Sequence, residues 1–141
     1  MAEITYREIE YFLYNYKKFD NMIKKIEEKY IGSINVTLNT WLKSRYDDNR
    51  SFENQVTAMA DDKRIIRYKK WQAFIKNMLA YFYVYSPIYY EFIDLKYFKK
   101  KSNNYIKNEM NIDSITLRDI RESTIAYIIS KAKEEKLDDG I

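Results

Sequence analysis

Residues 99–122 read KKKSNNYIKNEMNIDSITLRDIRE, and the order of polar and apolar side chains in this stretch predicts a helix followed by a sharp turn. Ser102 is placed to cap a helix over residues 103–110, because a serine hydroxyl accepts hydrogen bonds from the free N–H groups of a first helical turn. Asn111 then suits the end of that helix, since asparagine tolerates the left-handed backbone conformation found there.

A second helix is predicted directly after this turn, over residues 114–137, with Asp113 as its N-cap and Ile112 packed between the two helices. Its helical period directs five side chains inward: Leu117, Ile120, Thr124, Ile125 and Ile128. A helix, a short turn and a capped second helix form the layout in which the second helix enters the major groove of DNA.

The outward face of this second helix carries side chains that suit base recognition. Arg118 can donate two hydrogen bonds to guanine, Asp119 or Glu122 can accept one from cytosine, and Ile115 can contact a thymine methyl group. The predicted base-contacting residues are Ser114, Ile115, Arg118, Asp119 and Glu122.

Cations and hydroxyls on either side of the turn are placed to bind DNA phosphates and so to fix the register of the protein. The predicted phosphate contacts are Lys99, Lys100, Lys101, Ser102, Lys107, Thr116 and Arg121. The competing interpretation is a solvated lysine loop, with Arg118 and Glu122 forming an ion pair along an exposed helix. The combined spacing of two caps, an Asn turn and a buried Ile favours the DNA-binding interpretation.

Upstream of the three lysines, Ser86 and Pro87 supply an N-cap and a first-turn proline for a helix that continues to Phe98. The preceding residues belong to YFYVYSPIYY, over 81–90, the most aromatic part of the chain. Such rings can stack on single-stranded bases, but we expect them to pack at a helix junction.

Long helices are expected before this point. Thr5 and Glu8 form a capping box that begins a helix over residues 6–31, with Ile4 and Ile9 as the flanking hydrophobic staple. Gly32 is expected to end that helix in a left-handed C-cap. A loop over residues 33–49, with a short helical turn near Trp41 and Leu42, and a helix over 51–85 capped by Ser51 are predicted to follow.

The composition agrees with an all-α fold, because the 141 residues include only 2 Gly and 1 Pro. We expect a helical N-terminal region over 1–85, built on an antiparallel pair of long helices, and a helix-turn-helix domain over 86–141. The long helix over 51–85 needs a partner along its length, which is either the first helix or a second copy of the chain in a homodimer.

Several function classes are disfavoured. The chain has 0 Cys and 0 His, so it lacks cysteine nucleophiles, the usual histidine general base and the ligands of ordinary zinc sites. Adjacent carboxylates such as Asp47 and Asp48 point apart on a helix, which argues against catalysis. We therefore expect no enzyme, no catalytic residue, no cofactor, no metal site and no small-molecule substrate. The sequence shows neither a membrane span nor a signal peptide, which indicates a cytoplasmic protein.

Residues 86–137 resemble the helix-turn-helix of sigma factor region 4, in which a Gly-Ile-Ser-x-x-Thr-Val turn leads into the recognition helix. Here NIDSITL stands over 111–117, with Ile112, Thr116 and Leu117 as the matching positions. The long segment SFENQVTAMADDKRIIRYKKWQAFIKNML extends the resemblance upstream to residue 51. The whole chain resembles the RinA/ArpU/LtrC-type late transcriptional regulators of phages of low-GC Gram-positive bacteria.

That resemblance implies an activator of late-operon genes for packaging, structure and lysis that binds double-stranded promoter DNA and acts with bacterial RNA polymerase in the host cytoplasm. Two positions depart from the pattern: Lys107 stands for a small alanine and Asn111 for glycine. Lys107 either extends outward to a phosphate or holds the two motif helices apart. The alternative functions are a helical adaptor or inhibitor that binds a protein such as polymerase, a ring-forming terminase small-subunit-like packaging protein, and a carboxylate-only nuclease.

Overall fold

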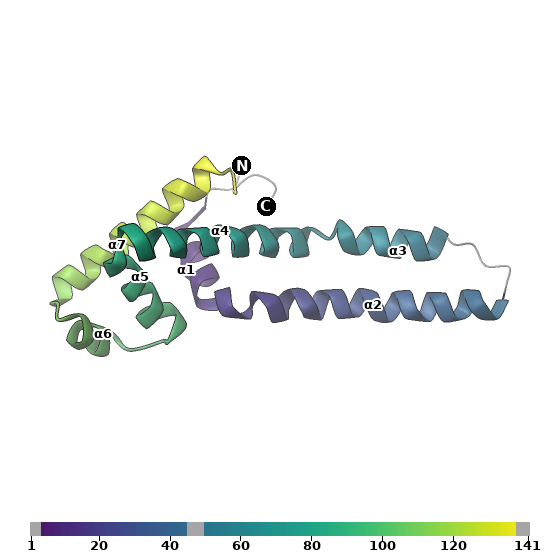
Figure 1. Cartoon of the computed structure of the whole chain (residues 1–141), viewed down its shortest axis with the longest axis horizontal. Coiled ribbons are helices and arrows are strands. Elements are labelled where there is room, and N and C mark those ends of the chain that lie inside the picture. Colours follow the sequence, from purple (N-terminus) through teal and green to yellow (C-terminus); the bar gives the residue numbers. More distant parts are fainter. Residues whose placement is uncertain (1–3, 45–49, 138–141) are drawn as a thin grey trace. The chain divides into compact units, whose positions relative to one another are not determined.

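The computed structural model describes residues 4–44 and 50–137, and the side chains of residues 4–34 and 53–137. The described residues form an all-α fold without strands (Figure 1). Its contacts group the chain into two compact units, one comprising residues up to 17 together with those from 70 onward, the other residues 18–69. This grouping differs from the division expected between residues 85 and 86, because the first helix packs with the C-terminal helices.

In the first unit, α1 (Tyr6–Asn15) begins as the capping box predicts, with the Thr5 hydroxyl accepting from the N–H of Glu8 at 3.2 Å. Ile4 and Ile9, the residues of the hydrophobic staple, are both buried. The helix then ends early: the 3₁₀ turn η1 (Tyr16–Lys18) separates it from α2 (Phe19–Ser44). The expected single helix over 6–31 is therefore wrong at residues 16–18.

The second unit contains α2 and α3 (Arg50–Ala60), which lie side by side and antiparallel (Figure 1). The predicted C-cap at Gly32 is wrong, because α2 continues through it to Ser44 and replaces most of the predicted loop. Ile34 explains the continuation: it is buried and extends the apolar stripe of Ile23 at helical spacing. Trp41 and Leu42 lie within α2, and the predicted loop residues 45–49 lie outside the described residues.

The predicted helix over 51–85 is divided in two, because α3 ends at Ala60 and α4 (Lys63–Tyr85) begins after Asp62. Asp62 explains the break. Its carboxylate accepts from the backbone N–H of Arg64 at 2.9 Å and from the hydroxyl of Tyr30 in α2, as an N-cap and a tertiary anchor together. Hydrogen bonds from Arg64 and then from Tyr30 hold the pKa of Asp62 well below its usual range. Ser51, the predicted cap, lies inside α3 instead.

The remaining elements belong to the first unit. They are α5 (Pro87–Ile93), the π-helical segment η2 (Asp94–Phe98), α6 (Asn103–Met110) and α7 (Ser114–Glu134). Ser86 is the N-cap of α5, as predicted, although its hydroxyl makes no capping hydrogen bond. α1 packs against both α7 and η2, and α5 packs against α7.

Aromatic rings fill the centre of this unit. Phe12 of α1 stacks on Trp71 of α4 with 4.2 Å between ring centroids, and Phe74 meets the same indole edge-on. Phe92 and Tyr97 are fully buried beside each other. All five side chains predicted to point inward from α7 are buried: Leu117, Ile120, Thr124, Ile125 and Ile128. α1 and α4 thus supply much of the core on which α7 rests, and α6 packs against η2.

Candidate nucleic-acid interface

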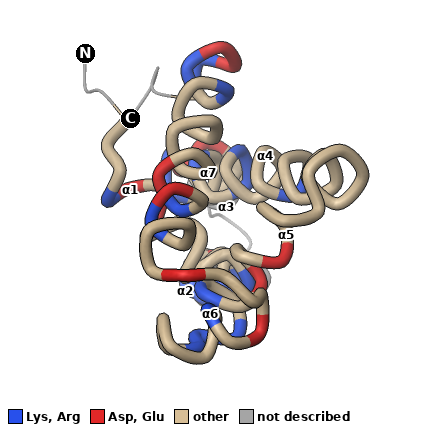
Figure 2. Tube along the Cα trace, turned by 90° about the vertical axis from the view of Figure 1, so that its left-hand side faces the viewer, with Lys and Arg blue, Asp and Glu red and all other residues tan. Residues whose placement is uncertain are grey.

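The turn before α6 carries the three consecutive lysines. Figure 2 shows in blue where Lys and Arg lie along the trace. Lys100 adopts a left-handed conformation at φ 55° and is exposed, while the N–H of Lys101 donates to the carbonyl of Leu95 at 2.9 Å. Lys99 forms an ion pair with Asp94 at 3.2 Å, and this hydrogen bond raises the pKa of Lys99. The ammonium of Lys101 lies over the ring of Tyr105. Lys100 is therefore the most freely available of the three cations.

Both predicted helix caps of the motif are confirmed. The Ser102 hydroxyl accepts from the N–H of Tyr105 at 3.1 Å, and Asp113 accepts from the N–H of Thr116 at 2.7 Å. Hydrogen bonds from Thr116 lower the pKa of Asp113. Asn111 has the predicted left-handed conformation, at φ 56°. Ile112 is half-buried rather than enclosed, so it fills the space between the helices less completely than expected.

The predicted base-contacting side chains all lie on the exposed face of α7. Ile115 is 63% exposed, although it is a large apolar side chain, and Arg118 and Asp119 are similarly open to solvent. The remaining members, Ser114 and Glu122, are exposed as well. The alternative ion pair between Arg118 and Glu122 is not found among the described residues. Arg118 instead approaches Asp119, with 4.0 Å between Nε and Oδ1.

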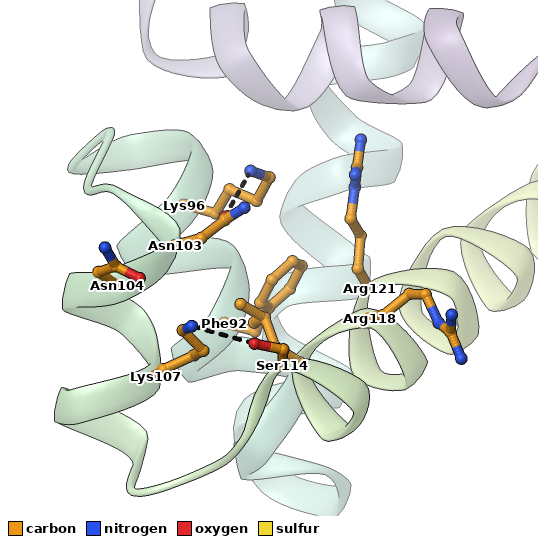
Figure 3. Close-up of a pocket in the computed structure, with 9 residues that line it drawn as sticks. Phe92, Lys96, Asn103, Asn104, Lys107, Ser114, Arg118 and Arg121 are labelled. Carbon is orange, nitrogen blue, oxygen red and sulfur yellow. Dashed lines mark hydrogen bonds between the residues drawn. The ribbon is translucent and has the colours of Figure 1, made fainter.

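Lys107 extends from α6 towards α7, where its ammonium donates to the hydroxyl of Ser114 at 3.0 Å (Figure 3). The contact joins the two motif helices, and it tests neither of the two expectations for this lysine, a phosphate contact or a wider separation of the helices. Thr116, another predicted phosphate contact, is exposed beside the Asp113 cap.

Arg121 occupies a different environment from the one predicted. Its guanidinium donates to both carboxylate oxygens of Glu10 in α1, at 2.9 and 3.1 Å, and lies over the ring of Tyr6. Tyr97 donates to the same carboxylate at 2.7 Å. Burial alone would lower the pKa of Arg121, but the hydrogen bonds to Glu10, the charge of that carboxylate and the nearby Tyr6 and Tyr97 together outweigh burial and raise that pKa. We therefore assign Arg121 to holding α7 against α1, not to phosphate contact.

A sequence reading missed this Glu10–Arg121–Tyr97 network because its members lie 111 and 87 residues apart in sequence. The sequence reading also missed Lys96, which η2 places beside α6, where its ammonium donates to the side-chain oxygen of Asn103 at 3.4 Å. In the sequence, Lys96 is marked only by its position between Leu95 and Tyr97. The structure shows that both of these neighbours are buried.

A second exposed surface consists of aromatic and aliphatic side chains around the junction of α4 and α5. Phe82 is buried there, as expected for packing at a junction, but Tyr83, Val84 and Tyr85 are each about two-thirds exposed or more, at 67, 66 and 71%. Ile88, in the first turn of α5, is also exposed. The prediction that this whole segment packs inward is therefore wrong for its outer residues.

The described residues contain no group of three or more side chains of the kinds that hold a metal ion. None of the described helices combines the length and the apolar character that crossing a bilayer requires. Comparisons with protein-family models, characterised proteins and solved structures found no match to this chain.

Proposed function

We propose that the protein binds double-stranded DNA through α6 and α7 and regulates transcription. One observation carries the proposal: the N-terminal half of α7 exposes Ser114, Arg118 and Glu122 on one face and buries Leu117 and Ile120 on the other. A helix held in this way presents donors and acceptors of the kinds that contact base edges in a major groove. Lys100 and the first turn of α6 lie on the preceding segment and supply phosphate contacts.

The finer regulatory role follows from the sequence resemblance. A late-operon regulator of a phage or prophage would act in the bacterial cytoplasm, alongside the host RNA polymerase. Activation is the sign of regulation that the resemblance implies. Either a monomer or a homodimer fits this role, and a dimer would contact two half-sites about one helical turn of DNA apart.

The proposal is tested by selecting bound duplexes from a random library and from fragments of the parent genome, followed by footprinting. We expect enrichment of a common sequence and protection of a short segment in its major groove. The Arg118→Ala variant should enrich a sequence that has lost its preference at one base pair. Recovery of unrelated duplexes in equal amounts, by the unmodified chain and the variant alike, would show that α7 does not read sequence.

A protein partner is the second candidate, and the exposed Tyr83, Val84 and Tyr85 favour it. Clustered exposed aromatic side chains are typical of protein-binding surfaces. A polymerase pull-down with the Tyr83→Ser/Tyr85→Ser double variant separates the two surfaces. If the double variant still binds DNA but no longer captures polymerase, the two activities belong to separate surfaces of the unit. If the double variant keeps both DNA binding and polymerase capture, the aromatic surface does not bind polymerase.

A further inference from the structure

A cleft of about 400 Å³ lies between α6, α7 and η2 (Figure 3). Phe92 and Leu117 line it with buried apolar surface, and polar side chains from all three elements line the rest. The cleft occurs where two helices of such a motif usually approach closely. Here Lys107 stands at the position of the expected small residue and reaches across to Ser114. A long cationic side chain therefore lies between the helices.

The lining of the cleft is strongly cationic. It includes Lys96, Lys107, Arg118 and Arg121, and none of the described residues that line it is acidic. Glu10 neutralises Arg121, but neither Lys96 nor Lys107 forms an ion pair with a carboxylate among the described residues. By contrast, the outer face of α7 mixes both signs of charge, because Asp119 and Glu122 stand beside Arg118.

Lys96 lies in a partly desolvated position. Burial, and then the nearby positive charge of Arg121, lower its pKa, with Glu10 acting in the opposite direction. A bound anion would replace the missing countercharge and so raise that pKa. The cleft thus contains two ammonium groups whose present partners, Asn103 and Ser114, are neutral.

The donors around the cleft suit a phosphate group. Lysine binds phosphate as a point charge, and a phosphate ester offers several acceptor oxygens that can be shared among ammonium, amide and hydroxyl donors. The Asn103 and Asn104 side chains and the Ser114 hydroxyl are such donors at the edge of the cleft (Figure 3).

We propose that this cleft binds a phosphate ester, with Lys96 and Lys107 as its charged contacts. This inference rests on the proposed function, which identifies the bound phosphate ester as a backbone phosphate of duplex DNA. A free phosphate or a mononucleotide offers the same chemistry from another source. The cleft adds Lys96, Asn103 and Asn104 to the surface that contacts DNA. Arg121 is then not required as a phosphate contact.

The experiment uses the full chain and measures duplex affinity over a range of salt concentrations for Lys96→Gln, Lys107→Gln and the double variant. Lys133→Gln is the matched control, because it removes the same charge from an exposed position near the C-terminal end of α7. Each cleft variant should weaken binding to all sequences alike and reduce the magnitude of the salt slope by about 1. The control should leave the slope unchanged, and circular dichroism checks that each variant folds.

NMR of the lysine ammonium groups in the unmodified chain gives a second readout that needs no variant. Addition of duplex DNA should raise the pKa of Lys96 and shift the Lys107 signal, whereas the Lys133 signal stays in place. If DNA binds but the cleft variants keep the full slope and these signals do not move, the cleft inference is overturned and the proposed function survives.

If the unmodified chain binds no duplex, the proposed function fails and a separate arm decides the cleft. Inorganic phosphate and adenosine monophosphate are then titrated against the same lysine signals. Saturable shifts of Lys96 and Lys107 that disappear in the double variant support a site for a small phosphate ester. If the Lys96 and Lys107 signals do not shift, or if the Lys133 signal shifts equally, the inference is overturned.

Discussion

Arg118 and Lys100 are both exposed cations, but we expect them to contact different parts of DNA. Arg118→Ala should cost about 1 to 3 kcal/mol of binding free energy at the base pair it contacts and relax the preference there. Lys100→Ala should weaken binding to all sequences alike. Competition assays with single-base-pair substitutions in the selected site measure both effects. Equal losses on every duplex for both variants would contradict a base-contacting role for Arg118.

Glu10 joins α1 to two other elements of its unit, since it accepts hydrogen bonds from Arg121 and Tyr97. Glu10→Gln keeps the shape but removes the charge, and it should lower the free energy of unfolding by about 2 kcal/mol. The cost stays below that of a fully buried ion pair, because the Arg121 side chain is 41% exposed. Urea unfolding measures the change.

Glu134→Gln is the matched control for this effect, because Glu134 pairs with Lys131 at 3.2 Å on an exposed surface. It should change the free energy of unfolding by less than about 0.5 kcal/mol. Similar losses in both variants would show that the Glu10–Arg121–Tyr97 network contributes no more than a surface pair.

Three of the helix caps could be predicted from sequence, because each depends on residues three positions apart. Thr5, Ser102 and Asp113 all make the side-chain hydrogen bonds that their spacing indicates. Lys96 and Arg121 meet their partners, Asn103 and Glu10, only because folding brings different elements together. No local sequence pattern predicts these contacts. The exposed face of α7 was therefore predictable, whereas the cleft behind it was not.

At the scale of elements, the turn between α6 and α7 depends on Asn111 at positive φ. Asn111→Ala should destabilise the protein by about 1 kcal/mol, because alanine gains no local hydrogen bonds in the left-handed region. Asn111→Gly should be neutral or slightly stabilising, since glycine adopts this conformation without steric cost. Thermal unfolding of the two variants measures the difference. An equal effect of both substitutions would contradict the left-handed turn.

Gly32 tests the continuity of α2. Because it lies inside the helix and a Cβ added there meets nothing within 4 Å, Gly32→Ala should stabilise the protein by about 1 kcal/mol. A glycine that ended the helix in a left-handed C-cap would give the opposite sign, because alanine is strained there. Chemical denaturation gives the sign directly, and a loss of stability would support the C-cap that the sequence suggests.

Element boundaries were less predictable than element types. The apolar stripe of the first 31 residues is continuous in sequence, yet Phe12 belongs to the core of one unit and Phe19 to that of the other. Likewise, the break before α4 depends on Asp62 accepting from Tyr30, a contact between different helices. Periodicity identifies which faces are apolar but not which partner each face meets.

At the scale of the whole molecule, the all-α class followed from composition, while the grouping into units did not. α1 contributes Ile9 and Phe12 to the unit that contains the motif, and Glu10 fixes α7 there. The boundary predicted between residues 85 and 86 follows the order of elements along the chain, whereas the units follow these contacts. The proposed interface thus depends on α1 as well as on α6 and α7.

The salt dependence of affinity tests the central claim, that a cationic surface on α6 and α7 binds duplex DNA, most directly. With about four phosphate contacts per subunit, the logarithm of the association constant should fall with the logarithm of salt concentration at a slope of about −3.6. Fluorescence anisotropy with the unmodified chain and one labelled duplex measures it. A steep negative slope is the predicted result, and a slope near zero would contradict DNA binding through this surface.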